Sequence, residues 1–126
     1  MHLQESGEMY LETIYVLSKT GKPVRAVDVG EHMGFSKPSV SRAIGLMKQG
    51  GYVVTDDEGH LLLTESGREA AAKTYERHTI LTELFVRLGV DPTTASEDAC
   101  KVEHDLSDET FTKIREFLDK YDHPEA

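Results

Sequence analysis

Two short helical patterns separated by a glycine restrict the fold of this chain more than any other feature. The first pattern covers about Arg25–Met33 and directs Val29 inward, and Gly34 then supplies a flexible turn residue. Ser36-Lys37-Pro38 begins the second helix, because proline at a first helical position loses no hydrogen bond that the helix would have made. The spacing therefore predicts a helix-turn-helix.

The second of these helices has a buried and an exposed side. Val40, Ile44 and Met47 recur at the spacing of one helix face and are expected to pack inward. The residues on the opposite, exposed side are Pro38, Ser39 and Arg42.

A hairpin pattern follows once Gly50-Gly51 has ended this helix. The runs Tyr52–Thr55 and His60–Leu63 are typical of short strands, and the acidic, glycine-containing segment 56–59 joins them. Helix, turn, helix and hairpin in this order predict a winged helix.

Helical periodicity dominates the rest of the chain. A first helix is expected over about Ser6–Ser18, and a long helix should begin between Thr64 and Ser66, where Ser66 and Glu69 fit a capping box. Asp91-Pro92 opens a further helix, and Ser107 caps the last one. The residues expected to form the apolar stripes of the long and last helices are Leu81, Leu84, Phe85, Leu88, Phe111, Ile114, Leu118 and Tyr121.

Charge is divided unevenly along the chain. The net charge is −9, which by itself argues against a nucleic-acid partner, because phosphate binding is driven by positive charge. Residues 19–50 nevertheless carry six basic and two acidic side chains, whereas residues 51–126 carry eight basic and eighteen acidic ones. This asymmetry indicates a basic binding module joined to an acidic body.

The amino terminus gives no sign of export. Glu5, Glu8 and Glu12 stand before and within the first apolar stretch, which is wrong for a signal peptide, and no apolar run approaches membrane-spanning length. We therefore expect a cytoplasmic protein without a membrane partner.

One segment carries the side chains of half a metal site. Cys100, Glu103 and His104 stand at i, i+3 and i+4, so one helix face is expected to hold a thiol, a carboxylate and an imidazole. The first helix places Met9 and Glu12 on one face in the same way. Because the chain has a single cysteine, Cys100 is a packed hydrophobe, a reactive thiol or a ligand.

Four segments in the correct order resemble the diphtheria-toxin-repressor family of iron- and manganese-dependent transcription regulators. They are Glu8–Tyr15, Ser36–Ser41, Leu63–Arg68 and Glu97–His104. The resemblance covers about residues 7–121 and implies the two-domain form of the family. The implied fold is mainly α, with an N-terminal winged helix-turn-helix DNA-binding domain (1–64) and an all-helical dimerisation and metal-binding domain (65–126).

The resemblance also implies a ligand set. Met9, Cys100, Glu103 and His104 match the activating site of the iron branch, whereas Glu12 and His78 match residues that the manganese branch retains. Two positions of the iron branch's ancillary site fall on Thr82 and Ser96, neither of which is a strong divalent ligand. A second ion held by Glu12, His78 and a shared Glu103 is the alternative that the manganese branch suggests.

The donor types favour a transition metal over magnesium or calcium, because thiolate and thioether sulfur are soft and hard cations prefer an all-oxygen shell. Sulfur with imidazole and carboxylate suits Fe(II), tolerates Co(II) and Ni(II), and also holds Zn(II). We expect Fe(II) as the cofactor, with Mn(II) second.

The expected function is metal-dependent repression at a palindromic DNA operator, by a homodimer that pairs through residues after about Thr64. Its targets are expected to be genes of metal-ion homeostasis. Arg42 and Ser39 are assigned to base edges and Pro38 to a thymine methyl group. The residues assigned mainly to phosphates are Arg25, Ser36, Lys37 and Ser41.

Two other functions fit parts of the sequence. A winged-helix regulator that senses an organic effector, or oxidation of Cys100, would bind DNA without regard to chelators. An enzyme would use Glu103 and His104 as acid, base or ligands of a hydrolytic metal. We expect no enzyme, because no nucleophile motif or glycine-rich phosphate loop accompanies these residues.

Overall fold

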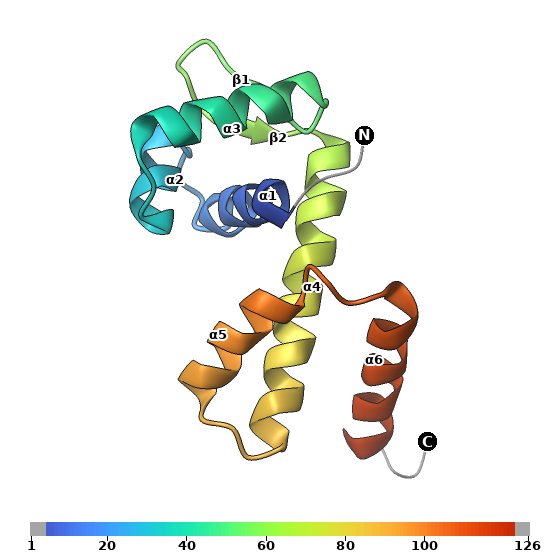
Figure 1. The fold of residues 1–126 in the computed structure, drawn as a ribbon. Coiled ribbons are helices and arrows are strands. Elements are labelled where there is room, and N and C mark those ends of the chain that lie inside the picture. Colours follow the sequence, from blue (N-terminus) through green and yellow to red (C-terminus); the bar gives the residue numbers. More distant parts are fainter. Residues whose placement is uncertain (1–4, 123–126) are drawn as a thin grey trace. The chain divides into compact units, whose positions relative to one another are not determined.

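The computed structural model describes residues 5–122, and these form six helices and one two-stranded antiparallel sheet (Figure 1). The elements in chain order are α1 (Glu5–Ser18), α2 (Ala26–Met33), α3 (Lys37–Gln49), β1 (Val53–Thr55), β2 (Leu61–Leu63), α4 (Glu65–Arg87), α5 (Pro92–Val102) and α6 (Asp108–Asp122). The predicted mainly helical fold with an N-terminal winged helix-turn-helix is confirmed.

The chain divides into two compact units, Met1–Lys73 and Thr74–Ala126, and the division falls within α4. The sequence predicts a boundary between two functional domains at residues 64 and 65, where α4 begins. This domain boundary is distinct from the division into compact units, and it stays a prediction. Among residues 5–122, no helix combines the length and the apolar composition needed to cross a bilayer.

The first unit has an apolar core to which every one of its elements contributes. Leu11 and Ile14 of α1 and Val29 of α2 have no exposed surface. The other buried apolar residues of this core are Tyr10, Val24, Val40, Ile44, Met47, Val53, Leu61 and Ala71. Val40, Ile44 and Met47 all belong to α3, so the predicted inward stripe of this helix is confirmed.

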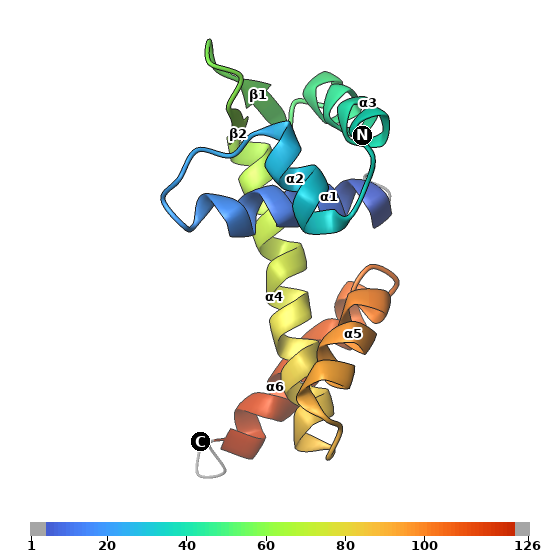
Figure 2. The same ribbon diagram turned by 90° about the vertical axis from the view of Figure 1, so that its left-hand side faces the viewer.

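Gly34 makes the turn between α2 and α3, as the sequence predicts. Its φ of 73° lies in the left-handed region that only glycine adopts without cost, and its N–H donates to the carbonyl oxygen of Gly30 at 2.8 Å. Ser36 caps α3, since its hydroxyl oxygen accepts a hydrogen bond from the N–H of Ser39. The turn thereby sets the direction of α3 relative to α2 (Figure 2).

The wing is a short hairpin in which Val54 pairs with Leu62. Asp56 closes its loop, because the carboxylate oxygen Oδ1 accepts hydrogen bonds from the N–H groups of Glu58 and His60 at 2.9 and 2.8 Å. The N–H of Leu61 also donates to the carbonyl oxygen of Val24 at 2.7 Å, which ties the hairpin to the segment before α2.

The predicted capping box at the start of α4 is wrong. Ser66 lies inside the helix, and Thr64 supplies the cap: its hydroxyl accepts from the N–H of Gly67 at 3.1 Å. The same hydroxyl donates to the carbonyl oxygen of Gly51 at 2.6 Å. Thr64 is therefore favoured by a contact with the end of the preceding helix, which the local pattern does not contain.

The second unit consists of the C-terminal part of α4 together with α5 and α6. Its buried apolar residues are Leu81, Ala95, Ala99, Phe111 and Leu118. Two residues predicted to point inward do not, because Leu88 is 71% exposed and Tyr121 is 61% exposed. Within residues 5–122, part of the predicted apolar stripe is therefore exposed.

Candidate metal centre

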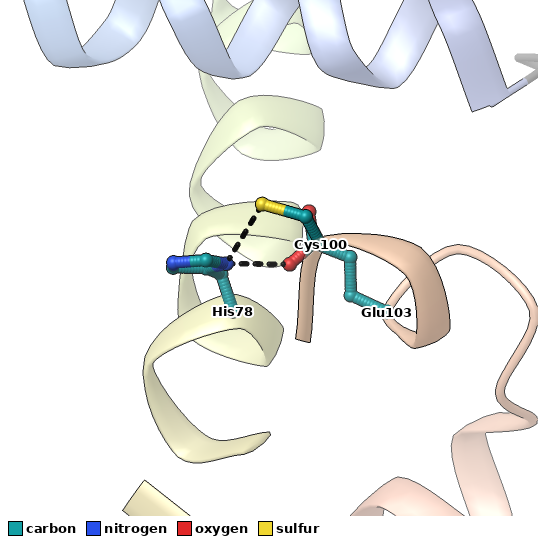
Figure 3. A group of neighbouring side chains, drawn as sticks. All are labelled: His78, Cys100 and Glu103. Carbon is teal, nitrogen blue, oxygen red and sulfur yellow. Dashed lines mark hydrogen bonds and ion pairs between the residues drawn. The ribbon is translucent and has the colours of Figure 1, made fainter. Parts of the chain in front are cut away.

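Three side chains of the second unit converge on one point (Figure 3). His78 comes from α4, Cys100 from α5, and Glu103 from the residue that ends α5. The imidazole Nδ1 lies 3.0 Å from the Glu103 Oε2 atom and 3.6 Å from the Cys100 Sγ atom. One nitrogen, one sulfur and one oxygen thus lie within 4.8 Å of one another.

Local structure explains why Cys100 and Glu103 share a face. Asp91 caps α5 by accepting from the N–H groups of Thr93 and Thr94, and the helix ends at Val102. Glu103 keeps right-handed helical angles and donates its N–H to the carbonyl oxygen of Ala99. Residues three apart in such a backbone lie on one side.

His104 does not extend this helix face, which corrects the prediction of one helical face carrying all three residues. It lies in the turn after α5, and its Nε2 atom is 3.3 Å from the Oε1 atom of Glu103. Its side chain is only 2% exposed. Among the described residues, the group whose donor atoms converge contains His78, Cys100 and Glu103, and His104 adjoins this group through the second carboxylate oxygen.

Burial differs among the three convergent residues. The side chain of Glu103 is 2% exposed and that of His78 is 20% exposed, whereas Cys100 is exposed to solvent. A buried carboxylate is costly unless positive or hydrogen-bonding groups compensate its charge. In this group the carboxylate of Glu103 is the buried donor, and Cys100 is the residue exposed to solvent.

Arg77 fixes the turn that carries Glu103. Its guanidinium donates to the backbone oxygen of Glu103 at 3.1 Å and to that of Leu106, and it pairs with the carboxylate of Asp108. Arg77 itself is buried and lies over the ring of Phe111. Because one rigid group holds both ends of the turn, the Glu103 side chain is directed consistently toward His78.

The donor set fits a divalent transition metal. Metal–ligand distances for imidazole, carboxylate and thiolate are about 2.0–2.3 Å, so two ligands of one ion stand at most about 4.5 Å apart. The separations of 3.0 and 3.6 Å fall inside this limit. All three donor atoms lie within 4.8 Å of one another, so these residues could hold one ion between them.

The other predicted ligands, Met9 and Glu12, lie on α1 in the first unit. Met9 is 36% exposed and Glu12 is half-buried. Their participation in the metal site stays a prediction.

Two further residues lie near the site, and the sequence pattern gives neither of them a role there. The hydroxyl oxygen of Ser96 lies 3.3 Å from Nε2 of His78, and Arg77 holds the Glu103 turn as described above. Ser96 stands four residues before Cys100, so helical spacing could have placed it on the same face. Arg77 carries no comparable sequence signal.

The residues assigned to DNA lie on the first unit. Lys37, Pro38, Ser39, Ser41 and Arg42 are all exposed on α3, and Ser36 caps that helix. Arg25, also exposed, donates from Nη1 to the carbonyl oxygen of Glu58 in the wing at 3.2 Å. Their contacts with DNA stay predictions.

Comparison with known proteins identifies the two parts of the chain. Residues 2–61 match the N-terminal DNA-binding domain of iron-dependent repressors, and residues 64–125 match the metal-binding and dimerisation domain of iron-dependent repressors. The chain belongs to the iron-dependent repressor family. This family contains metal-dependent transcriptional regulators, which confirms the predicted family and function class.

Three relatives are similar to this chain over most of its length. An uncharacterised HTH-type transcriptional regulator of Methanocaldococcus jannaschii is 35% identical over 121 residues, covering 94% of this chain and 97% of the relative. The diphtheria toxin repressor of Corynebacterium diphtheriae is 33% identical over 118 residues, covering 92% and 52%. The transcriptional regulator MntR of Escherichia coli is 31% identical over 120 residues, covering 95% and 77%.

Solved structures of similar regulators have the same fold. The manganese regulator SloR superposes with a TM-score of 0.80 at 28% identity, covering 94% of this chain and 55% of that one. A manganese-dependent transcriptional repressor in complex with manganese gives 0.83 at 28% identity, covering 89% and 52%. The chain thus spans about half the length of these two regulators and of the diphtheria toxin repressor.

Proposed function

We propose that this chain is a repressor that binds palindromic operator DNA as a homodimer when loaded with Fe(II), with Mn(II) as the second candidate ion. The observation that carries the proposal is the convergence of His78, Cys100 and Glu103 in a chain that also exposes a recognition helix, α3. Family membership supports a divalent metal, DNA and a second copy of the chain as partners. The regulated genes are proposed to serve metal-ion homeostasis.

The choice of Fe(II) is argued from the donor atoms. A thiolate beside an imidazole and a carboxylate is softer than the all-oxygen shells that hard cations prefer, and it weakens any special preference for Mn(II). We assign Met9, Glu12 and His104 as further ligands, because they match ligands of the two branches of the family. Met9 would add a second soft donor, which again favours Fe(II) over Mn(II).

The proposed control depends on α1, which carries Met9 and Glu12 and contributes Leu11 and Ile14 to the core of the DNA-binding unit. When bound, the cation supplies a positive charge that neutralises and joins donor groups of both domains. In its absence the carboxylates repel one another, and α1 is less firmly held. Raising a binding-competent arrangement from 1% to 99% of the population requires about 5.5 kcal/mol of differential binding.

DNA recognition is proposed to follow the exposed side of α3. Arg42 and Ser39 read base edges, and Pro38 contacts a thymine methyl group. Arg25, Ser36, Lys37 and Ser41 contact phosphates, which fixes the helix in the groove without reading sequence.

Pairing of two chains is proposed to use residues 65–126. The second unit exposes large apolar side chains, among them Val86, Leu88, Phe117 and Tyr121. Burying such side chains against a second copy would be favourable. A two-fold dimer then presents its recognition helices to half-sites about 34 Å apart, which is why the operator is proposed to be palindromic.

The experiment that tests the proposal is anaerobic fluorescence anisotropy with genomic DNA fragments. Binding is measured with Fe(II), Mn(II), Zn(II) or a chelator, for the wild-type chain and for Cys100→Ala. We expect each metal to tighten binding, and the substitution to weaken the response to Fe(II) most.

The alternatives give different results in the same experiment. Tight DNA binding that does not change with chelator would support a regulator that responds to an organic effector or to oxidation of Cys100. A Cys100→Ala variant that responds to Fe(II) as the wild type does would refute the assigned ligand set. Hydrolase assays with Fe(II) or Zn(II) test the enzyme alternative.

A further inference from the structure

Both ring nitrogens of His78 face a polar atom, and the two sides differ. Nδ1 faces Glu103 Oε2 and Cys100 Sγ, at 3.0 and 3.6 Å (Figure 3). On the opposite side, Nε2 lies 3.3 Å from the hydroxyl oxygen of Ser96. Ser96 is half-buried on α5, one helical turn before Cys100, so the same helix supplies a ligand on one side of the ring and a hydroxyl on the other.

The chemistry of imidazole makes the second contact important. A neutral ring carries one proton, and the nitrogen that binds a metal must be the one without it. The proton then stands on the other nitrogen, which needs a hydrogen-bond acceptor to hold the ring in place. In this geometry Nδ1 is the nitrogen directed at the thiol and the carboxylate, so Nε2–H is the group that requires an acceptor.

We propose that Ser96 is a positioning residue that assigns His78 to the same divalent ion as Cys100 and Glu103. When Nδ1 binds the ion, the Ser96 hydroxyl accepts a hydrogen bond from Nε2–H, which holds the ring in the orientation that directs the Nδ1 lone pair at the site. The inference rests on the proposed metal-binding function and deepens it.

A serine suits this position for a second reason. When the proton is on Nδ1, that nitrogen donates to the Glu103 carboxylate and the Ser96 hydroxyl donates to Nε2. When the proton is on Nε2, the same hydroxyl accepts a hydrogen bond from Nε2–H. The ring therefore keeps its orientation in both tautomers. Because Nε2 is hydrogen-bonded to Ser96, only Nδ1 of His78 is directed at a metal, and the residue binds one ion.

The test uses the full chain with Zn(II), a diamagnetic probe of the site. Long-range ¹H–¹⁵N correlation spectra of the histidine rings identify which nitrogen carries the proton and which is coordinated. In the Zn(II)-loaded wild type we expect His78 to be protonated on Nε2 and coordinated through Nδ1. A His78→Gln variant assigns the signal.

Three variants separate positioning from packing. Ser96→Ala should lower the affinity for Zn(II) by about ten-fold, the usual effect of removing a partner of a ligand. Ser96→Thr keeps the hydroxyl and should bind nearly as tightly as the wild type. Thr82→Val is the matched control: the Thr82 hydroxyl donates to the backbone oxygen of His78 at 2.7 Å, so its loss should leave the affinity unchanged.

The outcomes are distinct. If Ser96→Ala, folded by circular dichroism, binds Zn(II) as the wild type does, or if Nε2 of His78 is the coordinated nitrogen, the role assigned to Ser96 is wrong while the metal site stands. If the wild type binds no Zn(II), or binds it as tightly after Cys100→Ala, the proposed metal site itself fails, and the role of Ser96 fails with it.

Discussion

The guanidinium of Arg77 donates a hydrogen bond to the backbone carbonyl oxygen of Glu103 at 3.1 Å. This contact joins α4 to the turn that carries a candidate metal ligand. Arg77 is buried, and it also donates to the backbone oxygen of Leu106 and pairs with the carboxylate of Asp108. The geometry of that turn therefore depends on this guanidinium.

Arg77→Leu should therefore destabilise the second unit. The substitution leaves the carbonyl groups of Glu103 and Leu106 without their donor, which costs roughly 2–3 kcal/mol. Urea unfolding followed by circular dichroism measures the change. Arg115→Leu is the matched control, since Arg115 also lies over Phe111 but forms an exposed ion pair with Glu76. Its loss should cost less than about 1 kcal/mol, and equal losses for the two variants would contradict this account.

Gly67 lies where α4 passes close to the backbone of Tyr52, the residue before β1. A Cβ atom there would overlap the backbone oxygen of Tyr52, which cannot move without shifting β1. Gly67→Ala should lower the free energy of unfolding by roughly 1–3 kcal/mol. By contrast, Gly45→Ala in α3 meets nothing within 4 Å and should stabilise the chain by roughly 0.5–1 kcal/mol. Thermal unfolding compares them, and a neutral Gly67→Ala would show that the helix can move aside.

The wing should loosen at acid pH because of Asp56. The backbone N–H of His60 is the largest cause that holds the pKa of this carboxyl below its usual range, helped by the His60 side chain and the N–H of Glu58. A carboxyl whose pKa is lower in the folded state stabilises the fold above its unfolded pKa, about 3.9, and loses that effect as pH falls through the folded value.

Amide hydrogen exchange of residues 56–60 measures this loss. We expect protection to persist from neutral pH down to about 4 and then to decline, and Asp56→Ala to abolish it already at neutral pH. Asp57→Ala, which removes the neighbouring charge, is the control. Protection that survives in Asp56→Ala would mean that the hairpin holds its loop without this carboxylate.

Two exposed residues of α3 should affect DNA binding differently. Arg42→Ala should cost about 1–3 kcal/mol and relax the preference at one base position, because a base contact carries sequence information. Lys37→Ala should weaken binding to all sequences and reduce the salt dependence by about one counterion. Anisotropy titrations at several salt concentrations separate the two. A uniform loss in both variants would remove Arg42 from the base-reading set.

The sequence predicts those parts of the fold that depend on local signals. Gly34, Pro38 and Gly50-Gly51 each mark a helix boundary through their own backbone chemistry, and α2, α3 and the hairpin lie where these residues predict them. The capping-box pattern predicts Ser66 as the cap of α4. Thr64 takes that role through a hydrogen bond to Gly51, which is a tertiary contact and leaves no local trace.

In the candidate site, too, local spacing predicts some of the residues, and tertiary packing brings in the others. Cys100 and Glu103 are related by spacing along one segment, so their shared face could be predicted. The family resemblance implies a role for His78, and its contact with these two residues joins separate helices. The roles of Ser96 and Arg77 depend on the packing of α4 against α5 and the turn after it, which periodicity does not specify.

The central claim is that an ion bound by His78, Cys100 and Glu103 controls DNA binding, and thermodynamic linkage tests it directly. The affinity for Fe(II) is measured anaerobically with and without a DNA fragment that the protein binds. Any factor by which Fe(II) tightens DNA binding must equal the factor by which DNA tightens Fe(II) binding. We predict that DNA raises the affinity for Fe(II) in the wild type and not in Cys100→Ala. Equal affinities for Fe(II) with and without DNA in the wild type would contradict the claim.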